Sequence, residues 1–204
     1  ALIQLDATKQ NAIILYSGGN GAITKDEIDQ TLEHFSFGDV LVLQNEIVHT
    51  DYLIKQAKRR GMKVCMNVAP FDPSALSLPL DHIDLLVVNE IEGAGLAGMQ
   101  ETSDYKAILE RLVTRYPASE ILLTIGKQGC WYAFKDLRIH HDIYDTPVVD
   151  TTAAGDTFIG YYLASIARGC SIRQALQYAS KAAGLAVSRP GAMASIPLAE
   201  EVFS

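Results

Sequence analysis

Short apolar runs of strand length recur along the chain and alternate with stretches of helical spacing. The runs lie at 40–44, 63–68, 85–88 and 120–125, and the first of them has the composition of a buried strand. Strands that alternate with helices form parallel sheets whose faces the helices cover. The pattern therefore predicts an α/β fold with a mostly parallel central sheet.

Capping signals predict where the helices begin and end. Thr24 is followed three residues later by Glu27, a capping box that predicts a helix through about Phe35. Thr50 is expected to cap a second helix, which Gly61 ends. Further helices are predicted at 103–116, 155–168 and 171–188, with a short one from Pro197.

Four more apolar runs complete the predicted strands. Those at 2–6 and 12–17 are expected to pair across a polar turn at 7–11, and 131–134 and 138–144 follow the turn at 126–129. No repeat, low-complexity tract or long linker divides the chain. We therefore expect residues 1–204 to form a single α/β domain.

The composition and charge of the chain limit the classes of protein to which it can belong. The chain has 204 residues, 49% of them hydrophobic, and a formal net charge of −7. No apolar run reaches the roughly 18 residues that cross a bilayer, and no basic segment with an apolar core opens the chain. The acidic charge, with no Lys and Arg cluster beyond residues 55–60, disfavours nucleic acid and anionic membranes as partners. We expect a cytoplasmic protein.

The cysteines and the paired histidines do not predict a metal site. Cys65, Cys130 and Cys170 are odd in number and far apart, which favours buried reduced thiols over disulfides or thiolate ligands. His140 and His141 are adjacent, so on a strand they point to opposite faces and cannot chelate one ion together.

Three polar segments follow predicted strands, at 89–92, 124–129 and 150–156. In open α/β sheets, ligands bind at the carboxyl ends of the strands. The coincidence of the three segments therefore indicates a ligand site at that edge of the sheet.

The segment Asp150–Thr157 has the layout of an anion cradle with a base beside it. Ala153, Ala154 and Gly155 have little or no side chain, so their N–H groups can approach a ligand closely, and the following helix adds its positive dipole end. A carboxylate such as Asp156 cannot itself bind a phosphate, and its useful task is to accept a proton from a hydroxyl that attacks phosphorus. The segment therefore indicates phosphoryl transfer to an alcohol.

Four segments together resemble the ribokinase family of carbohydrate kinases, also called the PfkB family. Val149–Ala164, which reads V-D-T-T-A-A-G-D-T-F-I-G-Y-Y-L-A, is similar to the family's C-terminal signature. V-V-N-E-I-E at 87–92 is similar to its Asn-x-x-Glu motif, and L-T-I-G-K-Q-G at 123–129 to its nucleotide-binding turn. A-V-S-R-P-G-A-M-A-S at 186–195 resembles the loop that completes its monovalent-cation site.

The resemblance implies a three-layer ribokinase-like fold and an ATP-dependent sugar kinase, which moves the γ-phosphoryl group of ATP to a sugar hydroxyl. Asp156 matches the catalytic base that touches the substrate, and the amides of Ala153, Ala154 and Gly155 match the anion hole. The Ala-Ala form of the loop resembles ribokinase proper, so ribose-like pentoses are the expected substrates.

The resemblance also assigns residues to the nucleotide, the sugar and two cations. The nucleotide residues are Asn89, Thr124, Gly126, Gly129 and Ser180. Glu92 matches a residue that organises Mg²⁺ through water, as suits an ion that keeps its hydration shell. The K⁺ site matches Asp150, Thr152, Ala186, Arg189, Gly191 and Ser195. Glu46 matches an acidic residue that touches the sugar.

The family's sugar-recognition motifs lie on an N-terminal portion that has no counterpart in this sequence. The resemblance therefore implies an N-terminally truncated fold, with remnant lid strands at 1–17 that in the family can form a homodimer. An incomplete sheet would expose an apolar edge, and an open sugar pocket would admit water. We expect the full-length parent to be a kinase and the 204-residue chain to turn over little sugar.

Simpler structural interpretations stay open for the same residues. Gly126–Gly129 also fits a hairpin turn, Asn89 with Glu92 a helix cap, and Asp150 a turn cap. Gly18–Asn20 is interpreted as a plain turn rather than as a sugar-binding Gly-Gly motif. The alternative to a kinase is a non-catalytic fragment that binds nucleotide or sugar, or that oligomerises.

Overall fold

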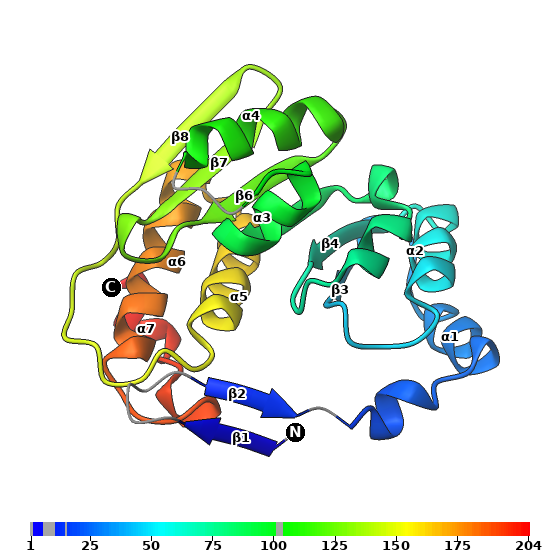
Figure 1. The fold of residues 1–204 in the computed structure, drawn as a ribbon, viewed down its shortest axis with the longest axis horizontal. Helices are drawn as coiled ribbons and strands as arrows, with labels where there is room; N and C mark the ends of the chain where they lie inside the picture. Colours follow the sequence, from blue (N-terminus) through cyan, green and yellow to red (C-terminus); the bar gives the residue numbers. More distant parts are fainter. Residues whose placement is uncertain (1, 6–10, 15, 101–103) are drawn as a thin grey trace. The chain divides into compact units, whose positions relative to one another are not determined.

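The computed structural model describes residues 2–5, 11–14, 16–100 and 104–204. The chain divides into two compact units, a first unit at 1–84 and a second unit at 85–204. Each unit is built from both strands and helices, as Figure 1 shows. Within the described part of the chain, no helix has the length and apolar character needed to cross a bilayer.

The first unit contains a hairpin and a parallel pair of strands. β1 (Leu2–Leu5) pairs antiparallel with β2 (Asn11–Ile14), which confirms the predicted strand pair. Most of the predicted turn between them lies outside the described residues. β3 (Val40–Leu43) pairs parallel with β4 (Lys63–Asn67), and α2 (Thr50–Arg59) connects the two.

The predicted capping box starts α1 (Lys25–Leu32). The Thr24 hydroxyl accepts the N–H of Glu27 at 3.2 Å, and the Glu27 carboxylate accepts the N–H of Thr24 at 2.8 Å. The helix ends at Leu32 rather than near Phe35, because the N–H of Phe35 turns back to the carbonyl of Leu32 in a tighter i→i−3 bond.

The second predicted helix cap is wrong. α2 begins at Thr50 itself, with His49 in the N-cap position at φ 60°. The Thr50 hydroxyl donates to the carbonyl of Ile47 at 2.8 Å, so the preceding turn satisfies this buried group. The end of the helix is as predicted, since Gly61 follows it with φ +74°.

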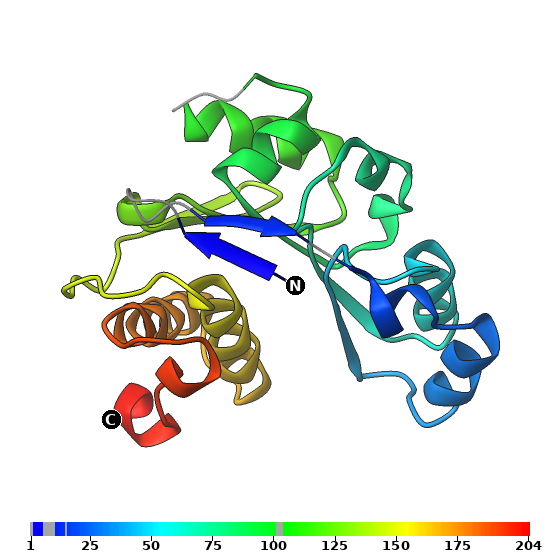
Figure 2. The same ribbon diagram turned by 60° about the horizontal axis from the view of Figure 1, so that its bottom comes forward.

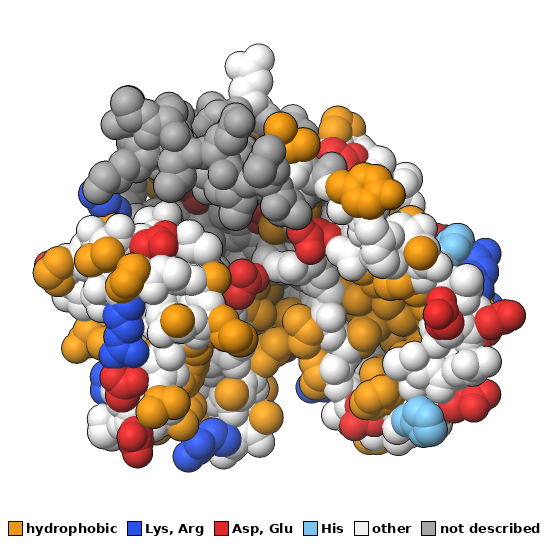
Figure 3. All heavy atoms as spheres, turned by 90° about the horizontal axis from the view of Figure 1, so that it is seen from below, with side chains coloured by type: hydrophobic (Ala, Val, Ile, Leu, Met, Phe, Trp, Pro, Cys, Tyr) orange, Lys and Arg blue, Asp and Glu red, His pale blue; other side chains and the backbone are white. Residues whose placement is uncertain are grey.

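β3 is not the buried strand that its composition predicts. Val40 is 48% exposed and Val42 is 51% exposed, because β4 is the only hydrogen-bonded neighbour of β3 among the described strands. An apolar groove of about 670 Å³ lies in the same unit, between α1 and β3, and is lined by Phe35, Val40 and Leu53 among others. Figure 3 shows apolar side chains gathered in a hollow over this unit.

Four strands run through the second unit. β5 (Leu85–Asn89) and β6 (Glu120–Thr124) are parallel, whereas β7 (Cys130–Phe134) and β8 (Leu137–His141) continue antiparallel. The central residues of β6, 121–123, are fully buried. Burial on both faces explains why this strand reads as a continuous apolar run rather than as an alternating one.

Helices cover both faces of the second unit's strands. Figure 2 shows one pair of helices above the strands and another pair below, which makes three layers. The upper pair is α3 (Glu90–Ala97) and α4 (Tyr105–Arg115), and the lower pair is α5 (Ala154–Ala167) and α6 (Ile172–Val187). α7 (Ala199–Phe203) closes the chain. α4, α5, α6 and α7 correspond to predicted helices, although the Ser103 start predicted for α4 lies outside the described residues, whereas α3 was not predicted.

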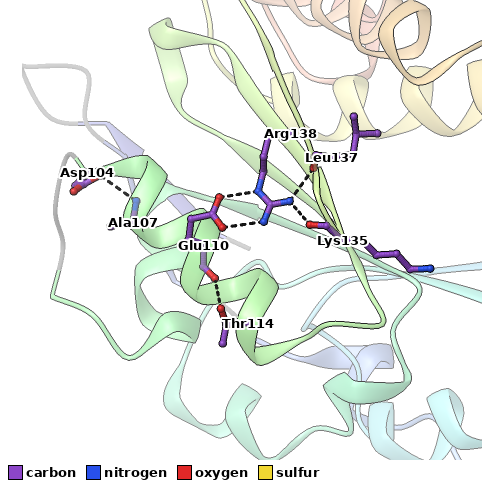
Figure 4. A network of polar contacts seen from close by, with 7 residues as sticks. All are labelled: Asp104, Ala107, Glu110, Thr114, Lys135, Leu137 and Arg138. Carbon is purple, nitrogen blue, oxygen red and sulfur yellow. Dashed lines mark hydrogen bonds and ion pairs between the residues drawn. The ribbon is translucent and has the colours of Figure 1, made fainter.

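β8 is shorter than predicted and is tied to α4. Arg138 binds the Glu110 carboxylate with two hydrogen bonds, at 2.7 and 2.8 Å, and also contacts the carbonyls of Lys135 and Leu137 (Figure 4). The strand ends at His141 instead of continuing to residue 144. The following segment leaves the sheet because it is hydrogen-bonded along α6, for example from Thr146 Oγ1 to Gly184 O at 2.9 Å.

Candidate active site

A tight turn precedes α5. Oδ1 of Asp150 accepts the N–H of Thr152 at 2.9 Å and its hydroxyl at 2.7 Å. Ala153 then occupies the N-cap position in a left-handed conformation, with φ 60°, and α5 begins at Ala154. Left-handed backbone is costly for a residue with a Cβ, and such strained residues are enriched at functional sites. The strained residue thus lies directly at the helix N-terminus.

The first turn of α5 keeps some amides available. The N–H of Ala154 donates to Thr151 O in a long bond of 3.3 Å, whereas no backbone acceptor within the described residues binds the N–H of Ala153 or Gly155. A Cβ built on Gly155 would meet nothing within 4 Å, so the space beside it is open. Available N–H groups and open space at a helix N-terminus suit an anion.

Asp156 follows these amides on the same helical turn. Asp156 is exposed to solvent. The next residue, Thr157, is buried and donates its N–H to the carbonyl of Ala153 at 2.9 Å. The arrangement puts a carboxylate beside an anion-binding helix terminus, which is what a general base for phosphoryl transfer requires.

Asp150 also joins this turn to the loop that follows α6. Its Oδ2 accepts the N–H of Gly191 at 3.0 Å, across 41 residues. Gly191 has φ +90°, a conformation that glycine adopts without steric cost. Hydrogen bonds from Thr152 and then from Gly191 hold the pKa of Asp150 below its usual range. Two loops of the predicted cation site are therefore fastened by one ionised carboxylate.

The remaining residues of the predicted cation site have partners of their own. The Arg189 guanidinium forms an ion pair with the Glu201 carboxylate of α7, so the positive charge of Arg189 is neutralised by that helix. The N–H of Arg189 donates to Ala186 O at 3.0 Å. Ser195 is fully buried, and its hydroxyl donates to Ala192 O at 2.7 Å.

Backbone carbonyls and one carboxylate are thus the oxygen donors that these loops can offer. Rings of carbonyl oxygens can replace the hydration shell of K⁺, so the donor set fits a monovalent cation. Across the described residues, no group of three His, Cys, Asp or Glu side chains could hold a metal ion by itself.

Asn89 and Glu92 form a reciprocal helix cap at the start of α3. Oδ1 of Asn89 accepts the N–H groups of Ile91 and Glu92 at 2.9 Å each, and the Glu92 carboxylate accepts the N–H of Asn89 at 2.8 Å. Glu92 is buried, and burial raises the pKa of its carboxyl group, helped by the nearby charge of Glu90. The simpler interpretation as a cap is correct, and it leaves a functional role open.

The parallel register of β5 and β6 brings two predicted segments together. Asn89 pairs with Thr124, so both lie at the carboxyl ends of neighbouring strands, as expected from the sequence. The turn that follows closes with the N–H of Ile125 donating to Gly129 O at 2.9 Å. A Cβ on Gly126 would lie 3.8 Å from Oε1 of Glu90, an acid of the polar segment 89–92.

Gly129 and Ser180 both contact the backbone at the end of β8, at residues 141–142. A Cβ on Gly129 would lie 2.0 Å from His141 O and 2.9 Å from the Cα of Asp142. The buried Ser180 of α6 donates its hydroxyl to Asp142 O at 2.9 Å. Two predicted nucleotide residues that are distant in sequence therefore converge on the end of β8.

Glu46 belongs to the first unit and is exposed in the loop after β3. Asn45 anchors this loop, because its N–H donates to Ala69 O and its side-chain amide to Pro70 O, each at 2.9 Å. This anchoring role of Asn45 is not predictable from the sequence, because its partners lie more than twenty positions away and no local pattern marks them.

The chain matches the pfkB family of carbohydrate kinases over residues 1–199. It is 33% identical to the ribokinase of Staphylococcus aureus (strain COL), over 99% of this chain and 67% of that protein. The Arabidopsis thaliana ribokinase structure complexed with ribose and ATP has a TM-score of 0.83 at 28% identity, over 98% of this chain and 66% of that one. The ADP complex of Cryptococcus neoformans var. grubii serotype A ribokinase has a TM-score of 0.85 at 27% identity, over 98% and 69%.

These similarities cover nearly all of the chain, which spans about two thirds of the length of those ribokinases. The TM-scores confirm the ribokinase-like α/β fold that the sequence motifs predict. With a match that extends over almost every residue, the chain belongs to the pfkB family of carbohydrate kinases.

Proposed function

We propose that the chain carries the catalytic and nucleotide-binding residues of an ATP-dependent sugar kinase. The observation that supports this most is the first turn of α5, where the available amides of Ala153 and Gly155 precede the exposed acid Asp156. An anion site and a base on one helical turn are the two parts that phosphoryl transfer to an alcohol needs.

In the proposed reaction, Asp156 accepts the proton of a sugar hydroxyl as its oxygen attacks the γ-phosphorus. A new oxygen–phosphorus bond forms while the bond between that phosphorus and the β–γ bridging oxygen breaks, so ADP leaves with the electron pair. The amides at the N-terminus of α5 stabilise the negative charge on the transferred group. Ala153, Ala154 and Gly155 keep the role that their small side chains predict.

Residues at the strand ends would hold the nucleotide and its cations. We assign the nucleotide to Asn89, Thr124, Gly126, Gly129 and Ser180. Glu92 would organise Mg²⁺ through water, and bound Mg²⁺ neutralises charge on the phosphates. We assign K⁺ to the loops that Asp150 fastens to Gly191, with carbonyl oxygens of Thr152, Ala186 and the 189–195 segment.

Ribose is the sugar we propose, because the similar Arabidopsis protein was solved with ribose and ATP and the S. aureus relative is named ribokinase. Glu46 would contact the sugar from the loop after β3. We further propose that the protein works in the cytoplasm, where ATP is abundant, and that the β1–β2 hairpin contributes to a homodimer.

A non-catalytic nucleotide- or sugar-binding module is the second candidate. It is favoured by the exposed valines of β3, which a further neighbouring strand would cover. Retention of Asp156 favours the kinase.

A phosphorylation assay separates the two functions. Purified chain would be incubated with MgATP and ribose, deoxyribose, fructose or a nucleoside, with K⁺ or with tetramethylammonium as the matched salt, and ADP and sugar phosphate would be measured. Sugar phosphate formed preferentially from ribose and stimulated by K⁺ supports the kinase. ADP binding without any sugar phosphate, for every acceptor, supports the binding module instead.

A further inference from the structure

We propose that His140 is a positioning residue for the nucleotide-binding turn, 126–129, an inference that rests on the proposed function. Nε2 of His140 lies 2.9 Å from the carbonyl oxygen of Gln128, within that turn. The histidine belongs to β8 and the turn joins β6 to β7, so the side chain reaches across the hairpin.

The chemistry of the contact fixes the tautomer of His140. A carbonyl oxygen only accepts hydrogen bonds, so Nε2 must carry a proton and donate it to Gln128. The turn has three backbone bonds of its own, from Ile125 N to Gly129 O at 2.9 Å, from Gln128 N to Ile125 O at 3.1 Å and from Gly129 N to Gly126 O at 3.2 Å. His140 therefore adds a fourth bond, at a carbonyl that the turn's own bonds do not use.

The imidazole ring is held in place by its neighbours. His140 pairs with Trp131 in the β7–β8 register, and the two rings lie 4.7 Å apart between centroids, tilted by 50°. Nζ of Lys106 in α4 lies 5.6 Å from the centroid of the Trp131 ring. A ring braced in this way holds its hydrogen bond with little loss of entropy.

The end of β8 thereby positions both halves of the predicted nucleotide site. Its backbone at residues 141–142 is what Gly129 packs against, and Asp142 O accepts the hydroxyl of Ser180. His140 adds a side-chain contact to the same turn from the same strand end. A nucleotide that binds a preformed turn avoids the entropic cost of ordering it, so affinity depends on this contact.

Two substitutions and a control test the role. His140→Phe keeps an aromatic ring beside Trp131 but removes the donor, whereas His140→Gln can place an amide N–H where Nε2 lies. His34→Phe, at an exposed position of the first unit, is the matched control. The readouts are the Kd for MgADP by calorimetry and amide hydrogen exchange at Gly129 without nucleotide.

We expect His140→Phe to raise the Kd roughly 3- to 10-fold, as for one lost hydrogen bond, and to speed exchange at Gly129. His140→Gln should restore both values to near those of the unaltered chain, and His34→Phe should change neither. An unchanged Kd in His140→Phe, or a Gln variant as weak as the Phe variant, overturns the proposal. If the unaltered chain binds no MgADP, the proposed function itself fails, which is a different result.

Discussion

Gly129 lies so close to His141 that no other residue fits: a Cβ at position 129 would stand 2.0 Å from the carbonyl oxygen of His141. The φ angle of Gly129, +87°, is also one that side-chain-bearing residues rarely adopt. Sterics and backbone conformation therefore demand glycine at the same position, in the turn that we assign to the nucleotide.

Gly129→Ala is expected to destabilise the chain strongly. The added methyl group must displace the end of β8 and hold an unfavourable φ, which together cost at least about 2 kcal/mol of unfolding free energy. Gly160→Ala is the matched control, since Gly160 lies exposed in α5 with nothing within 4 Å of a built Cβ. That change should stabilise by roughly 0.5–1 kcal/mol. Urea unfolding of both variants measures the difference, and equal midpoints would contradict it.

Asp156→Asn is expected to separate catalysis from binding. The amide keeps the size of the side chain but cannot take a proton, so turnover in the ribose assay should fall by roughly 10² to 10⁴. The Kd for MgADP should stay close to that of the unaltered chain. Asp26→Asn, which changes an exposed acid in the first turn of α1, is the control and should leave both values unchanged. Full turnover in Asp156→Asn would show that Asp156 is not the general base.

Asp150→Asn is expected to release the loop that Asp150 fastens. The asparagine can still accept from Thr152, but its amide group then faces the N–H of Gly191, donor against donor. We expect K⁺ stimulation of the kinase reaction to weaken at least severalfold, while hydrogen exchange at Gly191 speeds up. Gly191 exchange that matches the unaltered chain would show that the carboxylate does not hold the loop.

The same contact predicts a pH dependence. The folded-state pKa of Asp150 is lowered, first by its hydrogen bonds to Thr152, so it lies below the unfolded value of about 3.9. The ionised carboxylate therefore stabilises the folded state above about pH 4, and this contribution is lost as the pH falls through the folded-state pKa. The Gly191 amide signal should titrate only below about pH 4 in the NMR spectrum, and should not do so in Asp150→Asn.

Local sequence patterns predict a contact correctly where both partners lie within one helical turn. Thr24 with Glu27, and Asn89 with Glu92, are separated by three residues and form the capping boxes that their spacing predicts. Thr50 carries a similar signal, but its hydroxyl has an upstream carbonyl to bind, so it does not cap. A hydroxyl's choice between two nearby partners is not encoded in its residue type.

Contacts between residues that are far apart along the chain could not be predicted from the sequence. The bond from Gly191 to Asp150 spans 41 residues and that from His140 to Gln128 spans 12, and only the strand register and the helix packing bring them together. The motifs predict which segments carry the proposed site, whereas the residues that support those segments are found only from the fold. The exposure of Val42 likewise depends on which strands lie beside β3 rather than on its apolar composition.

Glu92→Gln is expected to raise stability at neutral pH. Burial raises the folded-state pKa of Glu92 above its unfolded value of about 4.3, so the ionised form costs the folded chain stability at pH values above the folded-state pKa. Glutamine carries no charge and can still accept the N–H of Asn89. Each kcal/mol of relief raises Tm by roughly 2–4 °C in a chain of this size.

The gain from Glu92→Gln should shrink as the pH falls towards about 4.3, because Glu92 itself then becomes neutral. Calorimetric scans from pH 5 to pH 8, with the exposed Glu33→Gln as control, measure this trend. A lower Tm at neutral pH would mean that attraction to the N-terminus of α3 outweighs the burial cost. If Tm rises while Mg²⁺-dependent turnover falls, the buried charge is retained for the reaction at the expense of the fold.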